Sequence, residues 1–158
     1  MLFLEVDGGC RHTRGYIGIG VSASKNGQTV AQISRVLRGK SSTDAELLAI
    51  AYGMCLAIAL GAKDAVIATD CRSCVDVLNG RSKKAADELN MRDNLLRIIT
   101  EMRDLHPGFL LTWMGRGSIT DAHELSTLAM ERYRHLMGLP GVNQRPTSAT
   151  NSSDPRGT

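Results

Sequence analysis

The dipeptide Asn26-Gly27 constrains the fold of this chain more than any other feature of the sequence. Asn-Gly favours the positive φ angles of a two-residue hairpin turn. Residues alternate on both sides of it, which indicates two antiparallel strands, residues 16–24 and 29–37. Residues 2–6 are mostly apolar and of strand-forming types, so they predict another strand before the hairpin. The first part of the chain is therefore predicted to form a three-stranded antiparallel meander.

The pattern then changes from strand to helix. Ser42, Thr43 and Asp44 are favoured N-cap residues, and they precede residues 45–60, which are apolar nearly all round. A helix that is apolar on every side is expected to be buried. The uncharged run is short for a membrane span and is interrupted by glycine, so we expect a core helix and no contact with a membrane.

The remaining segments complete the order β-β-β-α-β-α-α-β-α. The apolar run AVIAT is typical of a buried parallel strand. The predicted strands are residues 65–69 and 109–113, and the predicted helices are residues 71–78, 87–105 and 121–136. A hairpin sheet extended by crossover connections gives an α/β fold, with a mixed five-stranded sheet and helices on both faces.

The chain of 158 residues suits one domain, which we expect to span residues 1–139. Residues 140–158 contain one Val and no Leu or Ile, so we expect a disordered C-terminal tail. The net charge of +3 permits a nucleic-acid partner without requiring one. The N-terminus lacks the pattern of a signal peptide, and a cytoplasmic protein is expected.

The cysteines form no paired framework, which favours a reduced protein. Cys71 and Cys74 have CxxC spacing, but a zinc site would need two more ligands and a redox pair would need another fold context. An alternative is that Cys10 lies close to Cys71, so that oxidation inhibits the protein.

Three carboxylates fall at the ends of predicted elements. Asp7 follows the first strand, Asp70 follows the fourth, and Glu46 lies in the first turn of the buried helix. Taken singly, each has an ordinary structural explanation in turn chemistry or the helix dipole. If the first and fourth strands are neighbours, however, all three lie at one edge of the sheet. Oxygen clusters of this kind suit Mg²⁺ or Mn²⁺, and two such ions assist displacement at a phosphodiester.

Four segments, in order, resemble ribonuclease H type 1. They are DGGCRHTRGYIGIGV (residues 7–21), STDAELLAI (42–50), TDCRSCVDVLNG (69–80) and LTWMGRGSITDAHELS (111–126), and the match spans residues 2–136. The resemblance implies a ribonuclease H-like fold. It also implies hydrolysis of the RNA strand of an RNA/DNA hybrid, with two divalent ions held by four acidic residues and with 5′-phosphate and 3′-hydroxyl ends as products. Small members of this family are usually monomers.

Carried over by position, Asp7, Glu46 and Asp70 match the first three acids of the family. The fourth stands in Ala-Asp-x-Leu-Ala, which here reads Ala-His-Glu-Leu-Ser from residue 122 to residue 126. His123 therefore occupies the place of the fourth carboxylate. The resemblance makes all four residues candidates for both catalysis and metal binding.

The resemblance also implies residues that contact the substrate. Glycines after the first acid let a nucleic-acid backbone approach, and main-chain groups there contact the RNA 2′-hydroxyl in the family; the alternative is a plain β-turn. Hydroxyl groups stand before the helix where the family has asparagine, and a cysteine follows the third acid where the family has serine. The candidates are Gly8, Gly9, Cys10, Ser42, Thr43 and Cys71.

A short basic connector, with Arg81, Lys83 and Lys84, stands where some members have a basic protrusion. It either holds phosphates of the DNA strand or is a solvated surface turn.

The role of His123 leaves several alternatives. Neutral imidazole is a workable ligand for Mn²⁺ and a poor one for Mg²⁺, and it is also able to protonate a leaving oxygen. Otherwise His123 only packs or caps beside an N-cap formed by Asp121 and Glu124, or Asp121 supplies the missing acid. The histidine also fits a decayed site, in a module that binds hybrids or proteins without cleaving them. We favour an active site that contains His123 and prefers Mn²⁺.

Overall fold

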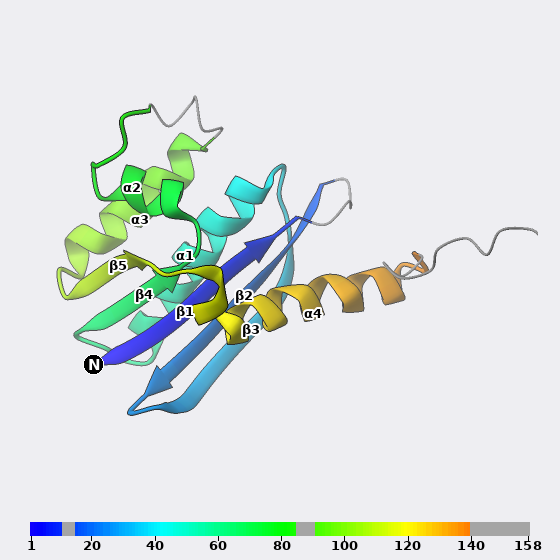
Figure 1. Ribbon diagram of the computed structural model, residues 1–158, viewed down its shortest axis with the longest axis horizontal. Helices are drawn as coiled ribbons and strands as arrows, with labels where there is room; N and C mark the ends of the chain where they lie inside the picture. Colours follow the sequence, from blue (N-terminus) through cyan, green and yellow to red (C-terminus); the bar gives the residue numbers. More distant parts are fainter. Residues whose placement is uncertain (11–14, 85–90, 140–158) are drawn as a thin grey trace, which may run out of the picture.

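The computed structural model describes residues 1–10, 15–84 and 91–139, and its element order confirms the predicted α/β fold (Figure 1). A short 3-10 helix, η1, was not predicted. The elements are β1 (Leu2–Gly9), β2 (Tyr16–Lys25), β3 (Gln28–Arg38), α1 (Ser42–Ala59), β4 (Ala65–Thr69), α2 (Arg72–Leu78), α3 (Asp93–Leu105), β5 (Phe109–Trp113), η1 (Arg116–Ser118) and α4 (Thr120–Leu136).

The five strands form one mixed sheet in the order β3-β2-β1-β4-β5. β2 pairs antiparallel with β1 and β3, and the turn between β2 and β3 has φ of 53° at Asn26 and 76° at Gly27, as the hairpin prediction requires. β1 and β4 are parallel neighbours. Their carboxyl ends therefore lie side by side, which is the arrangement that the predicted cluster of acids needs.

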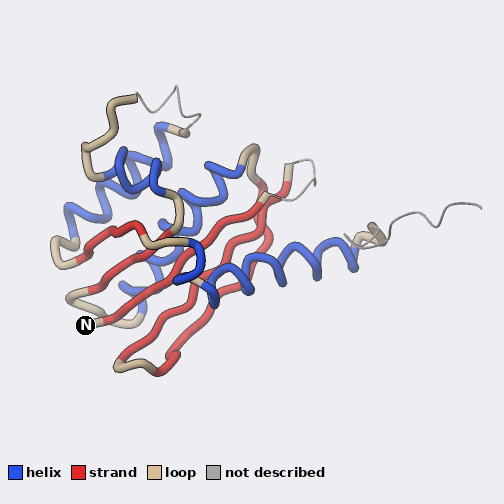
Figure 2. The backbone as a smooth tube through the Cα atoms, in the orientation of Figure 1, coloured by secondary structure: helices blue, strands red, loops and turns tan. Residues whose placement is uncertain are grey.

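Helices cover both faces of the sheet, with α1, α2 and α3 on one face and α4 on the other (Figures 1 and 2). The core lies between α1 and the sheet, where the largest side chains are fully buried; they include Leu4, Leu47, Ile50, Met54 and Ile67. α1 has the length and apolar composition of a membrane span, but half of it is buried within the protein. That packing is typical of the core helix of a globular domain.

Two glycines of β2 let α4 lie directly on the sheet. A Cβ atom added at Gly20 would overlap the carbonyl oxygen of Ala122, and one added at Gly18 would overlap that of Ser126. Because β2 lies next to β1, this close approach brings the first turns of α4 next to the end of β1.

Several predicted boundaries differ from the structure. α1 begins at Ser42 and not at Ala45, and its N-cap is Ser41, whose side-chain oxygen accepts a hydrogen bond from the Asp44 N–H at 3.1 Å. The N-cap of α4 is Ile119, so the predicted capping by Asp121 is wrong: that residue lies inside the first turn. The predicted start of α3, at residue 87, lies outside the residues that the structure describes. The predicted tail, residues 140–158, also lies outside them.

Candidate active site

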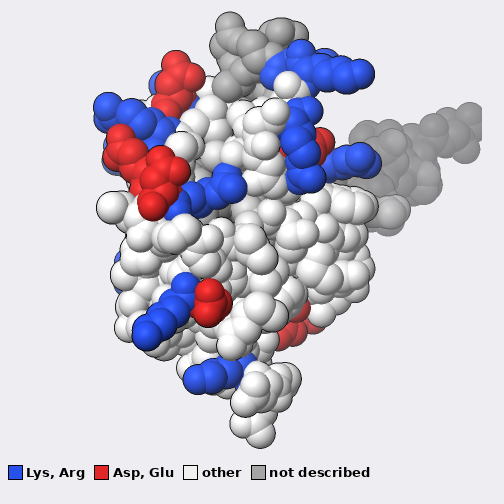
Figure 3. Space-filling view, turned by 90° about the vertical axis from the view of Figure 1, so that its left-hand side faces the viewer, with Lys and Arg blue, Asp and Glu red and all other residues white. Residues whose placement is uncertain are grey.

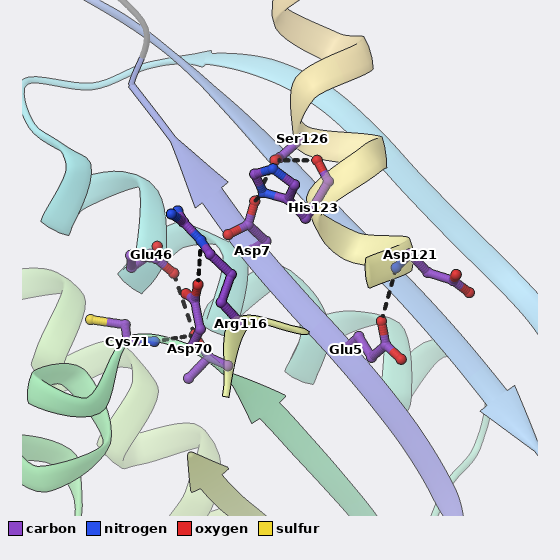
Figure 4. A network of polar contacts seen from close by, with 10 residues as sticks. Glu5, Asp7, Glu46, Asp70, Cys71, Arg116, Asp121, His123 and Ser126 are labelled. Carbon is purple, nitrogen blue, oxygen red and sulfur yellow. Dashed lines mark hydrogen bonds and ion pairs between the residues drawn. The ribbon is translucent and has the colours of Figure 1, made fainter. Parts of the chain in front are cut away.

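The structure brings the three predicted carboxylates together at the carboxyl ends of β1 and β4 (Figure 4). Asp7 belongs to β1, Asp70 directly follows β4, and Glu46 lies near the start of α1. One carboxylate oxygen from each lies within 4.8 Å of the others. Gly8 makes this possible, because an added Cβ there would overlap the backbone of α1 and lie 2.5 Å from the nitrogen of Glu46.

The cluster strongly perturbs Glu46. Burial, followed by the negative charges of Asp7 and Asp70, raises the pKa of Glu46 to about 8, although the hydroxyl of Thr69 donates to its carboxylate at 3.3 Å and opposes the rise. A divalent cation among the three groups would offset this repulsion. The donors are all carboxylate oxygens, so the residues present fit Mg²⁺ or Mn²⁺.

Arg116 also reaches the cluster. It lies in η1, after β5, and its Nε donates to Oδ2 of Asp70 at 3.1 Å, while 76% of its side chain stays exposed. Arg116 was not predicted from the sequence, where the basic residues considered were Arg81, Lys83 and Lys84. The position of an arginine shortly after Trp113, in the segment that leads to His123, was the available signal.

His123 lies beside the cluster and contacts one of its members. Its Nδ1 is 3.2 Å from Oδ2 of Asp7, and 41% of its side chain is exposed. Because an ionised carboxylate only accepts hydrogen bonds, Nδ1 carries the hydrogen in this contact and a neutral ring keeps the lone pair on Nε2. Metal-binding histidines commonly have this arrangement, in which the second ring nitrogen donates to a carboxylate.

Ser126 is a further site residue that the sequence analysis did not identify. It is 2% exposed, and its hydroxyl donates to the same Oδ2 atom of Asp7 that His123 contacts (Figure 4). It stands three residues after His123, so the two side chains share one face of α4. The spacing places Ser126 on the same face as His123, but only the close packing of α4 on β2 reveals its partner.

Asp121 is engaged elsewhere. Its Oδ2 accepts a hydrogen bond from Ser22 at 3.3 Å, and its N–H donates to Glu5 at 3.2 Å. Burial, opposed in part by backbone hydrogen bonds, raises the pKa of Glu5, and the charge of Asp121 adds to the rise. Figure 4 shows Asp121 turned away from the three carboxylates, so it does not supply the fourth acid in this arrangement.

A cavity of about 360 Å³ opens over the site. Four of the predicted substrate-binding residues line it: Gly8, Gly9, Cys10 and Ser42. Thr43 and Cys71 are not among the described residues that line it. Thr43 is the next residue along α1 and therefore points about 100° away from Ser42. Cys71 caps α2, and its N–H donates to the hydroxyl of Thr69 at 3.1 Å.

The expectation of unpaired cysteines is wrong for one pair, since a disulfide joins Cys71 and Cys74. The CxxC spacing at the start of α2 places their Cα atoms 5.4 Å apart, within the range that a disulfide spans. Cys10 is exposed and free, so the alternative of a pair between Cys10 and Cys71 is not observed.

A second cavity, of about 440 Å³, lies at the same end of the sheet and is basic. It is lined by Gly15, Tyr16, Arg38, Gly39, Lys40 and Arg92. The buried carboxylate of Asp44 organises it, accepting from the Lys40 N–H at 2.9 Å and lying 3.9 Å from Arg92 Nη1. In contrast, the face that includes the amino ends of β1 and β4 has few charged side chains across its middle (Figure 3).

In the predicted basic connector, Arg81 lies 3.9 Å from Asp76, and Lys83 and Lys84 are exposed.

The chain has a ribonuclease H-like fold. The fold is defined by the order of the strands and the helices on both faces of the sheet, and three carboxylates meet where the adjacent parallel strands β1 and β4 end. The chain belongs to the family described as reverse transcriptase-like, whose model matches residues 5–129. Both findings confirm the predicted resemblance to ribonuclease H. No match to a curated protein sequence was found.

Several solved structures are similar to this chain. LC11-RNase H1, isolated from compost and solved in complex with an RNA/DNA hybrid, is 20% identical, with a TM-score of 0.73 over 84% of this chain and 99% of that one. The N-terminal RNase H domain of a Mycobacterium tuberculosis protein is 23% identical, with a TM-score of 0.70 over 86% and 97%. RNase H1 of the archaeon Halobacterium salinarum is 21% identical, with a TM-score of 0.69 over 83% and 98%. At these identities the likeness establishes the fold.

Proposed function

We propose that this protein hydrolyses the RNA strand of RNA/DNA hybrids and leaves 5′-phosphate and 3′-hydroxyl ends. The observation that carries the proposal is the cluster of Asp7, Glu46 and Asp70, with one oxygen from each within 4.8 Å of the others, in a chain of this fold. Clustered carboxylates are costly to keep ionised without a cation between them. Burial first, and then the charges of Asp7 and Asp70, raise the pKa of Glu46 and make its ionised form costly.

The three carboxylates would hold two Mg²⁺ or Mn²⁺ ions. When bound, the ions would supply positive charge to the attacking and leaving oxygens of the phosphodiester. The residues themselves orient the site, because Asp7 and Asp70 are fixed at strand ends and Glu46 is held over them by the close contact at Gly8. Glu46 must lose its proton when a cation binds, so metal affinity should increase as the pH rises toward 8.

His123 would take the place of a fourth carboxylate. Its Nδ1 contact to Asp7 fixes the ring and leaves Nε2 free of that contact. The lone pair on Nε2 would bind a metal ion in the neutral ring, whereas Nε2 would donate a proton to the leaving oxygen only in the imidazolium form. Imidazole suits Mn²⁺ better than Mg²⁺, so we propose higher activity with Mn²⁺.

The two cavities would bind the two strands. Main-chain groups at Gly8 and Gly9, in the cavity over the carboxylates, would approach the RNA strand and its 2′-hydroxyl, and Ser42 would add a hydroxyl contact. The basic cavity, with Arg38, Lys40 and Arg92, would bind phosphates of the DNA strand.

A hybrid-binding module without catalysis is the second candidate. The observation in its favour is His123 in the place of an acid, since one anion fewer weakens the binding of two cations. This candidate predicts binding of the hybrid and no cleavage in either metal.

The experiment is the cleavage of an end-labelled RNA/DNA hybrid, with duplex DNA and duplex RNA as controls, in Mg²⁺ and in Mn²⁺. We expect cleavage of the hybrid alone, with loss of activity in Asp70→Asn. Binding of the hybrid by the native protein without cleavage in either metal would instead favour the second candidate.

A further inference from the structure

Two side chains of α4 converge on a single oxygen of Asp7. His123 Nδ1 lies 3.2 Å from Oδ2, and the hydroxyl of Ser126 donates to the same atom. Both residues depart from the Ala-Asp-x-Leu-Ala pattern that this segment resembles, in which aspartate and alanine stand at these places. The two departures therefore meet at one atom of the site.

The hydroxyl of Ser126 is rigidly placed. The residue is 2% exposed, and α4 lies so close to β2 that a Cβ atom at Gly18 would overlap the Ser126 carbonyl oxygen. The hydroxyl also lies 3.0 Å from the carbonyl oxygen of His123, but it has one hydrogen to donate. A carboxylate is the stronger acceptor, so the hydrogen belongs to Asp7.

We propose that Ser126 is a positioning residue of the metal site, which orients Asp7 directly and His123 through Asp7. The other oxygen of Asp7 points away from α4 toward Glu46 and Asp70 (Figure 4), so the hydroxyl holds the carboxylate with that oxygen turned to the metal side. The hydroxyl and the imidazole share Oδ2, and movement of the carboxylate would also move the ring. The proposal rests on the metal-dependent function proposed above.

The test measures Mn²⁺ binding rather than catalysis. The dissociation constant is obtained from the electron paramagnetic resonance signal of free Mn²⁺, on metal-depleted full-length chain. Loss of a partner that orients a metal ligand weakens metal binding about 10- to 100-fold, so Ser126→Ala should raise the dissociation constant about tenfold. In a His123→Asp background the same change should raise it by a smaller factor, about threefold, because Ser126 then orients Asp7 alone and no imidazole depends on that carboxylate.

Controls separate positioning from folding. Thr100→Ala removes a helix hydroxyl that donates to the Leu96 carbonyl oxygen at 2.9 Å in α3, away from the site, and should leave Mn²⁺ binding unchanged. The melting temperature in EDTA is recorded for every variant. Ser126→Cys keeps the side chain near its native size with a much weaker donor, and should weaken Mn²⁺ binding in the same direction as Ser126→Ala.

An unchanged dissociation constant in both Ser126→Ala and Ser126→Cys would overturn the proposal. An equal weakening of Mn²⁺ binding in the native and His123→Asp backgrounds would also overturn it. So would weaker Mn²⁺ binding that occurs only in variants whose melting temperature has fallen. Failure of the proposed function gives a different result: Mn²⁺ binding would show the expected dependence on Ser126, while no hybrid would be cleaved.

Discussion

Replacing Glu46 by glutamine removes from the cluster a carboxyl group whose pKa is raised to about 8. Without metal, the native protein keeps this carboxyl protonated up to about that pH, whereas the unfolded chain ionises near 4.5. The folded state therefore binds more protons than the unfolded state between these values. Stability from this group is fully present below pH 4.5 and is lost as the pH rises toward 8.

The magnitude follows from the width of that window. Each pH unit corresponds to about 1.4 kcal/mol. Between pH 4.5 and pH 8, the free energy of unfolding of Glu46→Gln should therefore increase relative to that of the native protein by at most roughly 5 kcal/mol. Such a gain is measurable against a typical total stability of about 5–15 kcal/mol. The amide keeps an acceptor for the Thr69 hydroxyl, so the change isolates the charge.

The assay is urea denaturation in EDTA at pH 5, 6.5 and 8. Glu101→Gln is the matched control, because Glu101 is an exposed carboxylate on α3, at 65% side-chain exposure. A difference between Glu46→Gln and the native protein that stays constant from pH 5 to pH 8 would refute the electrostatic reasoning. Added Mn²⁺ should stabilise the native protein and reduce the difference at pH 8.

Three further predictions test the surroundings of the carboxylates. Gly8→Ala should lower the free energy of unfolding by about 1–3 kcal/mol in urea denaturation, because its Cβ overlaps the backbone of α1, whereas Gly115→Ala, with open space around it, should not. Arg116→Ala should lower kcat/KM for the hybrid about 100-fold in single-turnover assays, with an unchanged melting temperature, because it removes a cation next to Asp70 that would face the phosphodiester; equal rates would show that this cation does not assist cleavage. Arg38→Ala should reduce the slope of log affinity against log salt by about one in binding titrations, whereas Lys63→Ala, near the amino end of β4, should leave the slope unchanged.

The fold was predictable because local patterns and chain connectivity agree. The runs AVIAT and FLLTW have the bounds of β4 and β5. AVIAT is apolar, as a buried parallel strand must be, and it lies between Asp64 and Asp70, whereas FLLTW follows the break at Pro107-Gly108. The convergence of Asp7 and Asp70 followed from placing β1 beside β4. Helix starts were less predictable, because several hydroxyl and acidic residues in a row can each serve as the N-cap, and only the contact between Ser41 and Asp44 decides between them.

Arg116 and Ser126 were not predictable from local patterns, because their roles arise from long-range contacts. Arg116 reaches an acid 46 positions earlier, and Ser126 reaches one 119 positions earlier. Taken locally, Arg116 is an ordinary polar residue between a strand and a helix, and Ser126 is an ordinary polar residue of a helix. The close approach of α4 to β2 at Gly18 and Gly20 brings Ser126 to its partner, and nothing in the spacing of α4 alone reveals that approach.

The central claim is that His123 completes a working metal-dependent nuclease site. The most direct measurement is the rate of RNA-strand cleavage at saturating Mn²⁺ by the native protein, His123→Ala and His123→Asp. We predict hybrid cleavage by the native protein, a large loss in His123→Ala and partial recovery in His123→Asp. Cleavage that appears only in His123→Asp would contradict the account and would mean that the histidine had switched the site off.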